Sequence, residues 1–255
     1  MTNSDTPPLI SRADIPAALG LLTRLPLRVD FDRARARSAQ ATWAYPLVGL
    51  VVGSGMALLG LVLTTLGLPD QITAALVLAL SIIVTGAMHE DGLADSADGL
   101  WGGWDPDHRL TIMKDSYIGA YGVIAIGLSL ILRWSLLTVL VGTPAGLLAM
   151  IAAAMLSRAS MTALMVWLPN ARTTGLSQSV GRPAFASGGI AVGISILAGV
   201  IFMGVSVAPA VIAVAVTAFV CGAIARAKIN GQTGDILGAT QQLTEIAALT
   251  VILTA

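Results

Sequence analysis

The residues with the most evident chemical potential are acidic and lie in one polar stretch, residues 89–100, which reads His-Glu-Asp-Gly-Leu-Ala-Asp-Ser-Ala-Asp-Gly-Leu. Asp91, Asp95 and Asp98 recur at intervals of four and three residues, so on a helix they share one face within about 60° of arc. Carboxylates so close together repel one another unless a cation lies between them. Because carboxylate oxygens suit Mg²⁺, with Mn²⁺ as an alternative, the stretch predicts a metal site completed by water and substrate phosphates.

A solvated acidic loop is the alternative interpretation of this stretch, since Asp and Gly are also common turn residues. The same loop contains Trp101, Trp104 and Met113, which a purely solvated linker would not need. The aspartates also begin where an apolar run ends. We therefore expect them at a membrane surface.

Three other polar segments carry groups suited to a diphosphate. Lys114 supplies a positive charge just before an apolar run, and Asp115 or Ser116 is suited to cap the helix that begins there. The first amides of such a helix favour phosphate. Taken alone, Arg172 is also typical of a topology determinant and Asp235 of a helix cap, but together with the aspartates they would complete a diphosphate site.

Two charged residues fall deep inside apolar runs. Arg158 and Glu245 each lie ten residues from the predicted cytoplasmic end of their run, which is about 15 Å along a helix. Because ionised groups inside a bilayer usually face a partner, we expect these two to pair beneath the acidic site. Arg133 lies nearer the outer end of its run, where its side chain is expected to reach outward.

Membrane-spanning helices are the elements that must position these residues. Hydrophobic residues make up 56% of the chain and charged residues 11%, and the mean hydropathy is +0.85. Seven apolar runs have lengths near those of membrane spans, which need about 17–25 residues. The runs lie at about 47–66, 72–87, 118–141, 145–168, 188–205, 207–225 and 236–254. We predict an all-α, polytopic transmembrane helix bundle of about seven spans, forming one integral membrane domain over residues 1–255.

The positive charges predict the orientation of this bundle. Lys and Arg residues lie before the first run and in every second loop after it, while the alternate loops near Asp70, Thr143 and Ser206 contain none. Since positively charged short loops stay in the cytoplasm, the N-terminus is expected inside the cell. Residues 1–40 then form a cytoplasmic segment with a short interfacial helix near 15–25, and all the polar segments above share the cytoplasmic face.

Composition also restricts the partners. Fourteen basic and fourteen acidic residues cancel, so no overall field favours nucleic acid. Cys221 is the single cysteine, which excludes an intramolecular disulfide and argues against a cysteine metal site. The first forty residues contain four prolines and no pattern of a cleaved signal peptide. Membrane lipid is the expected surrounding, and a homo-oligomer is left open.

Several short motifs together extend over nearly the whole chain: Thr23-Arg24-Leu25-Pro26, Tyr45-Pro46-Leu47-Val48-Gly49, His89-x-Asp91-Gly92-Leu93-Ala94-Asp95-x-x-Asp98-Gly99, Ile112-Met113-Lys114-Asp115-Ser116, Ala171-Arg172-x-x-Gly175 and Thr233-Gly234-Asp235. With these motifs the chain resembles the adenosylcobinamide-GDP ribazoletransferases, or cobalamin synthases. The long aspartate motif is the specific one. Glu90 stands where an apolar residue is expected in relatives, so it is either incidental or an extra ligand.

The resemblance implies the last assembly step of the cobalamin nucleotide loop, at the bacterial cytoplasmic (inner) membrane. α-Ribazole or its 5′-phosphate attacks adenosylcobinamide-GDP, GMP leaves, and adenosylcobalamin or its 5′-phosphate forms. The implied metal ligands are Asp91, Asp95, Asp98 and Asp115, and the implied substrate-binding residues are Lys114, Arg158, Arg172 and Asp235. The implied catalytic residues are Lys114 and the two candidates for the general base, His89 and Asp115. His89 points nearly opposite the aspartates on an ideal helix, which favours a structural role for it.

Two other functions are consistent with part of the pattern. Asp91-Gly92 is reminiscent of CDP-alcohol phosphotransferases, which include phospholipid synthases, but Asp95 departs from the motif of that family. An ion or solute transporter is suggested by the charges within the runs. Transport predicts polar residues near mid-bilayer in several helices, whereas the acidic residues here crowd at one surface. The transferase is therefore the preferred prediction.

Overall fold

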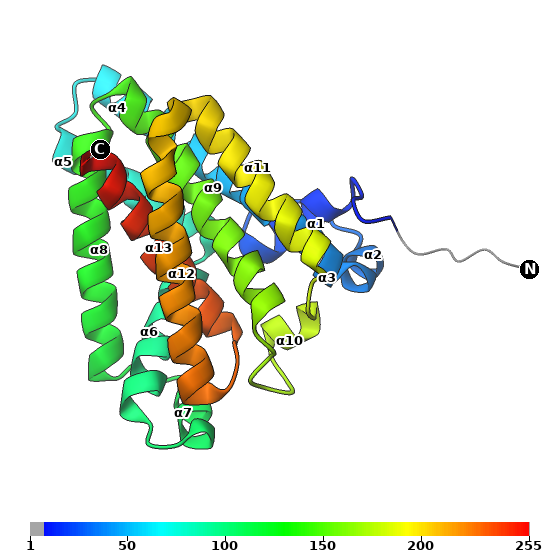
Figure 1. The fold of residues 1–255 in the computed structure, drawn as a ribbon. Helices are drawn as coiled ribbons and strands as arrows, with labels where there is room; N and C mark the ends of the chain where they lie inside the picture. The colour runs from blue at the N-terminus through cyan, green and yellow to red at the C-terminus, as the bar shows by residue number, and fades with distance from the viewer. Residues whose placement is uncertain (1–7, 255) are drawn as a thin grey trace, which may run out of the picture.

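The apolar runs of the sequence fold into helices, as predicted. The computed structural model describes residues 8–254, so residues 1–7 of the predicted cytoplasmic segment lie outside that range. The described chain contains α-helices and two short 3-10 segments but no strand (Figure 1). In order these are α1 (Asp14–Leu22), α2 (Phe31–Ala36), α3 (Ser38–Ala41), η1 (Thr42–Ala44), α4 (Tyr45–Thr65), α5 (Asp70–Thr85), α6 (Met88–Gly102), α7 (Pro106–Ile112), α8 (Ala120–Leu140), α9 (Pro144–Trp167), α10 (Leu176–Val180), α11 (Phe185–Met203), η2 (Gly204–Val207), α12 (Ala208–Ile229) and α13 (Gly234–Thr254). The all-α prediction is confirmed.

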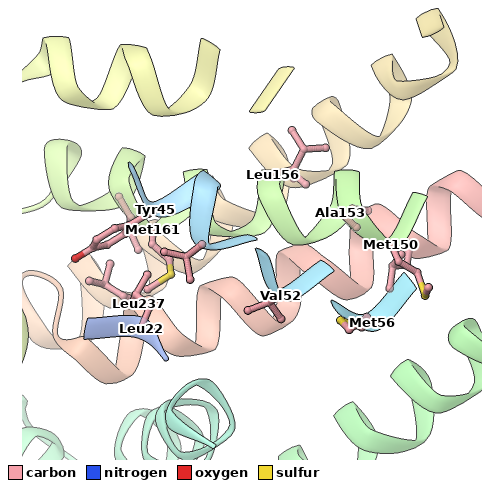
Figure 2. Close-up of a cluster of buried hydrophobic side chains, with 14 of the residues drawn as sticks. Leu22, Tyr45, Val52, Met56, Met150, Ala153, Leu156, Met161 and Leu237 are labelled. Atoms are coloured by element: carbon pink, nitrogen blue, oxygen red, sulfur yellow. The ribbon is translucent and has the colours of Figure 1, made fainter. Parts of the chain in front are cut away.

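Helix α9 forms the centre of the bundle. It packs against α4, α11, α12 and α13, and every residue from Ala152 to Thr162 is buried. Figure 2 draws part of the buried cluster that joins α4 to α9, with Val52 and Met56 on α4 and Met150 and Ala153 on α9. A helix that is buried on all sides suits the centre of a membrane bundle.

Small residues let α4 approach α9 closely. A Cβ atom added to Gly53 would lie 2.8 Å from the Cα of Ile151, and one added to Gly49 would collide with the carbonyl of Ala154. Backbone contact of this kind is typical of packed membrane helices, where small side chains maximise van der Waals contact. The predicted role of these glycines in packing is confirmed.

The number of membrane spans is less firmly defined than the helices. Five helical segments of the described chain are long and apolar enough to cross a membrane, and the α5–α6 pair makes a sixth if it counts as one bent span. One of the five, 185–229, has 45 residues, more than twice the about 20 that a span needs. It contains α11 and α12, which meet at the top of Figure 1 and run in opposite directions. The chain is a polytopic membrane helix bundle, and seven spans stays a prediction.

The polar stretch forms a helix of its own because the chain turns sharply before it. Helices α5 and α6 meet at 85°, and the corner consists of Gly86 and Ala87, both in the left-handed region with φ of 65° and 57°. A side chain at Gly86 would collide with Arg24, whose backbone N–H donates to the Val84 carbonyl at 2.7 Å. The Thr23–Pro26 motif therefore packs at the corner and fixes where α6 begins.

Helix α1 lies where an interfacial helix was expected, but it is fastened to the bundle. Asp14 is buried and accepts hydrogen bonds from Arg37 Nε at 2.7 Å and from Trp43 Nε1 at 2.8 Å. Burial acts to raise the pKa of Asp14, but the hydrogen bonds from Arg37 and Trp43 hold that pKa below its usual range. Leu22, at the end of α1, is buried as well. Contact of α1 with lipid stays a prediction.

Replacing Gly49 by alanine should destabilise the bundle, because the new methyl group would push α4 away from the backbone of α9. The expected loss is about 1–3 kcal/mol of folding free energy, measured as a lower melting temperature in detergent. Gly55→Ala is the matched control on the same helix, since its added Cβ would have no neighbour closer than 3.9 Å. Equal melting temperatures for the two variants would contradict the packing.

Candidate active site

Helix α6 brings its aspartates to a junction with α13. Gly92 lies where the two helices touch, because a Cβ atom there would come within 2.8 Å of the Asp235 carbonyl oxygen. About one turn further along the same contact, a Cβ atom on Gly238 would lie 3.2 Å from the Cα of His89. The two glycines thus set the distance between the helices and place Asp235, near the start of α13, beside the acidic face of α6.

Arg172 joins the third polar segment to this junction. Its Nη1 lies 3.2 Å from Asp235 Oδ2, and its Nη2 donates to the Leu110 carbonyl at 2.9 Å. The backbone N–H of Gln232 donates to the Pro169 carbonyl at 2.9 Å, which ties the loop of Arg172 to the loop before α13. The polar segments that were expected to share a site therefore meet in the structure. Their place on the cytoplasmic side stays a prediction.

Asp95 lies on α6, outside the five spanning segments, in an acidic environment. Burial raises the pKa of Asp95 to about 7, the carboxylates of Asp235, Asp91 and Asp115 act in the same direction, and Arg172 opposes them. Ionising a carboxyl group among other carboxylates costs free energy. A cation among these groups would relieve the repulsion.

The donors at this junction fit a hard divalent cation that keeps some ligands from solvent or substrate. In the part of the chain that the structure describes, no three His, Cys, Asp or Glu side chains stand close enough to hold a metal ion by themselves. Mg²⁺ is commonly bound through one or two carboxylates together with water and substrate phosphates. Asp91 and Asp95, the two aspartates whose carboxylates contribute to this acidic environment from α6, would hold it. Metal binding itself stays a prediction.

Asp98, the third predicted metal ligand on α6, caps a neighbouring helix. Its carboxylate accepts hydrogen bonds from the N–H groups of Gly119 at 2.7 Å and Gly122 at 2.9 Å, at the start of α8. The expected cap at Asp115 or Ser116 is therefore wrong, and these two amides of α8 bind Asp98 instead of a phosphate. Both oxygens of Asp98 are already engaged, which makes Asp91 and Asp95 the better candidates for the metal.

Lys114 and Asp115 lie together in an open depression of about 550 Å³, which Arg172 also lines. Both side chains are exposed, and Asp115 Oδ1 accepts a hydrogen bond from the Tyr117 N–H at 2.9 Å. The structure thus groups a lysine, an arginine and a carboxylate in a recess open to solvent. Their roles toward phosphate, metal or proton stay predictions.

Arg172 also lines a second, more enclosed cavity of about 240 Å³. Asp91, Asp235 and Arg172 are charged residues in its lining. The remaining lining comes from segments 21–22, 88–89, 170–180 and 232–238 and from Tyr45, Met161 and Met165. Arg172 therefore borders both recesses, and Asp91 borders the enclosed one.

His89 lines the enclosed cavity and is almost completely buried. Its exposed fraction is 1%, and its Nε2 has no hydrogen-bond partner within the described chain. Burial, together with the positive charges of Arg158 and Arg133, holds the pKa of His89 well below its usual value. The imidazole is therefore neutral, and a low pKa makes it a weak proton acceptor.

A buried charge network lies between α6, α8, α9 and α13. Glu245 lies 3.9 Å from Arg158 Nη1, so the predicted pair is confirmed, and 3.2 Å from Arg133 Nη2. Arg133 also donates to Glu90 Oε1 at 2.7 Å and is 3% exposed. The prediction that Arg133 reaches outward is therefore wrong, because two carboxylates hold it inside the bundle. Glu90 is the partner of Arg133, a role that the sequence did not indicate.

Arg158 does not occupy the place that was predicted for it as a substrate-binding residue. It is 2% exposed, lines neither recess described above, and donates to the Ala154 carbonyl on its own helix at 3.0 Å. Gln241 and Gln242, which the sequence reasoning missed, complete the network: Gln241 donates to Glu245 at 2.6 Å and Gln242 to Glu90 at 3.1 Å. Their presence beside Glu245 in an apolar run was the available signal.

Comparison with known proteins assigns the family. The profile of the cobalamin-5-phosphate synthase family matches residues 14–253. The chain belongs to this family. The resemblance inferred from the aspartate motif is confirmed, and the residues that line both recesses all lie within the matched residues.

Several relatives share most of their length with the chain. One from Bradyrhizobium diazoefficiens is 42% identical over 240 residues, which cover 94% of this chain and 92% of the relative. Others from Mesorhizobium japonicum and Brucella ovis are 39% and 38% identical, over 93% and 91% of this chain and 92% and 93% of their own lengths. All three are named adenosylcobinamide-GDP ribazoletransferase. No solved structure matches the chain.

Replacing Arg133 by leucine should destabilise the bundle strongly, because it leaves Glu90 charged and buried without its 2.7 Å partner. Removing one member of a buried ion pair typically costs on the order of 3–5 kcal/mol. The measurement is the melting temperature in detergent, with Arg226→Leu as the control at an exposed position. A loss no larger than that of the control would show that the network does not hold α6.

The stability of the metal-free protein should fall as pH rises from about 4 to about 7. Asp95 has a pKa of about 7 in the folded chain, against an ordinary value of 3.8 for an aspartate carboxyl, so between these limits the folded state binds more protons than the unfolded state. The loss should be smaller in Asp95→Asn but not absent, because burial also raises the pKa of Asp235, and at pH 8 added Mg²⁺ should raise the melting temperature of the parent protein more than that of the variant. Identical pH profiles for the two proteins would contradict the acidic environment of Asp95.

Proposed function

We propose that this chain joins adenosylcobinamide-GDP to α-ribazole or to α-ribazole 5′-phosphate and releases GMP. An oxygen of the ribose forms a bond to the phosphorus on the cobinamide side of the diphosphate. The bond from that phosphorus to the bridging oxygen breaks, and GMP leaves with the bridging oxygen. The names of the relatives support the substrates, and the acidic junction supports the chemistry.

The observation that carries the proposal is the grouping of carboxylates with one fixed arginine between two recesses. Arg172 is held by Asp235 and by the Leu110 carbonyl, so its guanidinium is oriented before any phosphate arrives. Groups that are positioned in advance lose little entropy on binding and stabilise developing charge without rearrangement. If the diphosphate lay across Arg172, the groups on its two sides could occupy different recesses.

The remaining groups divide the work on the diphosphate. Lys114, exposed in the open depression, steadies phosphate oxygens as a mobile positive charge. Mg²⁺ or Mn²⁺, held by Asp91 and Asp95, would neutralise the negative charge of the diphosphate. Asp115 is the preferred acceptor of the ribose proton, since it is exposed beside Lys114, whereas the low pKa of His89 disfavours that residue.

We also propose that the bundle spans the bacterial inner membrane with its N-terminus and both recesses on the cytoplasmic side. Trp101, Trp104, Tyr117 and Phe185 are between 53% and 85% exposed, and all belong to or adjoin the polar segments 88–117 and 169–187. Aromatic side chains of this kind concentrate at the membrane–water interface. A belt at this end of the bundle, together with the positive charges there, supports the orientation.

Asp91→Asn and Asp95→Asn should each reduce GMP release by at least about a hundredfold. Each substitution removes a carboxylate that would hold the metal, and the metal is needed to neutralise the diphosphate. The assay uses membranes that contain the chain, adenosylcobinamide-GDP, α-ribazole and Mg²⁺. Asp107→Asn, an exposed acid on α7, is the matched control and should retain activity. Membrane insertion and melting temperature verify that the variants fold.

The same assay separates the proposal from its alternatives. Full activity of both variants would remove Asp91 and Asp95 from the metal site. Absence of GMP release by the parent chain, with release of CMP from a CDP-alcohol, would favour a phospholipid synthase. Absence of both products, with metal-dependent flux into vesicles, would favour a transporter.

A further inference from the structure

An apolar groove lies between α11 and α12, and none of its lining residues belongs to either recess. The two helices meet at η2 and diverge from there, with α9 visible between them (Figure 1). A Cβ atom on Gly199 would lie 2.7 Å from Val207 Cγ2, so α11 and η2 are in contact at the closed end. The groove has a volume of about 300 Å³ and is lined by residues within 156–167 of α9, 192–196 of α11 and 211–219 of α12.

The lining of this groove is almost entirely hydrocarbon. Apart from the indole of Trp167, the polar side chains among the described residues that line it are Ser160 and Ser195. Ser160 donates its hydroxyl hydrogen to the Ser157 carbonyl at 2.6 Å, and Ser195 donates to the Ala191 carbonyl at 3.0 Å. Both hydroxyl groups are thus engaged within their own helices. The groove is therefore suited to a hydrocarbon chain, which needs no hydrogen bond.

The length of the groove matches one leaflet of a bilayer. From Leu156 to Trp167 the groove follows α9 for about three turns, which is roughly 16 Å. One leaflet contributes half of the ~30 Å hydrocarbon core. Both side walls belong to segment 185–229, which is apolar enough to lie in a membrane. An acyl chain of one leaflet can therefore lie along the whole groove.

The groove ends beside Trp167, the last residue of α9. The ring of Trp167 stacks on Phe219 with 5.4 Å between the ring centroids, and a Cβ atom on Gly222 would collide with the same ring. The polar segment 169–187 follows almost directly. Because tryptophan concentrates at the membrane–water interface, this is the end of the groove at which lipid headgroups are expected.

Two exposed arginines flank Trp167 at this end. Arg182 Nη2 donates to the carbonyls of Val166 at 2.7 Å and of Trp167 at 3.3 Å. Arg226 lies one turn beyond Gly222 on the same face of α12. Neither arginine forms an ion pair within the part of the chain that the structure describes. Their charges are therefore available to an anion, and guanidinium groups bind phosphate oxygens well.

We infer that this groove binds an anionic phospholipid, with one acyl chain between α11 and α12 and the phosphate at Arg182 and Arg226. Basic residues at the end of a space between membrane helices are typical of sites for anionic headgroups. The bound lipid would contact α9, the helix at the centre of the bundle. The inference does not depend on the proposed reaction, because no residue of this site takes part in it.

Other occupants match only part of the site. A helix of a second copy is about 10–12 Å across with its side chains, which a groove of about 300 Å³ does not accommodate. A free phosphate would contact the arginines but leave the apolar groove unfilled. A zwitterionic phospholipid would fill the groove but bring an ammonium group that the two arginines repel. An anionic phospholipid matches both the charge and the apolar surface.

The test compares phosphatidylglycerol with phosphatidylethanolamine of the same acyl chains. Each lipid is titrated into the purified, delipidated full chain in detergent, and binding is measured by native mass spectrometry. Each arginine should contribute about fivefold to the affinity for phosphatidylglycerol. Arg182→Gln and Arg226→Gln should each lose that factor, and the double variant should bind both lipids equally. Arg28→Gln, at an exposed position between α1 and α2, is the matched control and should bind like the parent protein.

A second pair of variants tests the place of the acyl chain. Ala215 lines the groove, so Ala215→Phe would put a ring into the space of the chain and should weaken binding of both lipids by at least about fivefold. Val216→Phe is the matched control, since Val216 is the next residue of α12, is exposed and does not line the groove. Melting temperatures measured without lipid verify that the variants fold.

Three results would overturn the inference. Equal affinity of the parent protein for both lipids would leave Arg182 and Arg226 as topology determinants only. A rise in melting temperature with inorganic phosphate as large as that with phosphatidylglycerol would assign the two arginines to a free anion. A chemically cross-linked dimer that Ala215→Phe abolishes would assign the groove to a second copy of the chain.

Discussion

Glu90 and Arg133 form an ion pair 2.7 Å long in a part of the bundle where an unpaired charge would be very costly. The pair fixes the rotation of α6 about its axis, since Glu90 must face Arg133 on α8 and Gln242 on α13. Successive residues on a helix are about 100° apart, so the next residue, Asp91, turns away from the network and is exposed. The ion pair between Glu90 and Arg133 therefore orients the acidic face of α6, although neither residue takes part in the proposed chemistry.

Other contacts then fix α6 along its length. Its beginning is set by the left-handed corner that packs on Arg24, and its middle by the contact of Gly92 with the backbone of Asp235. Its end is held by Lys228, whose Nζ donates to the Leu100 carbonyl at 2.8 Å. Polar side chains on an element held at three points keep their separation when a ligand arrives, which is the condition for a site that stabilises charge without rearrangement.

The features that follow from helical periodicity and hydropathy could be predicted from the sequence. The side-chain contacts that depend on which helices are neighbours could not. The shared face of the aspartates and the pairing of Arg158 with Glu245 follow from residue spacing and depth. The inward direction of Arg133 does not, because hydropathy locates a residue along a helix but not around it. The capping role of Asp98 depends on two amides of α8 that lie more than twenty residues away in sequence. The corner requires a non-glycine residue, Ala87, at positive φ, which propensity does not indicate.

The position of the site at the end of a membrane bundle accounts for its two unlike halves. Helices that cross a membrane are covered with apolar side chains, so a recess at the ends of α4, α9 and α13 is lined in part by apolar side chains, here Tyr45, Met161 and Leu237. The loops that join the helices must be polar, because they meet water and headgroups. A recess at this boundary is therefore lined by apolar side chains from the helices and by polar or charged groups from the loops and helix ends.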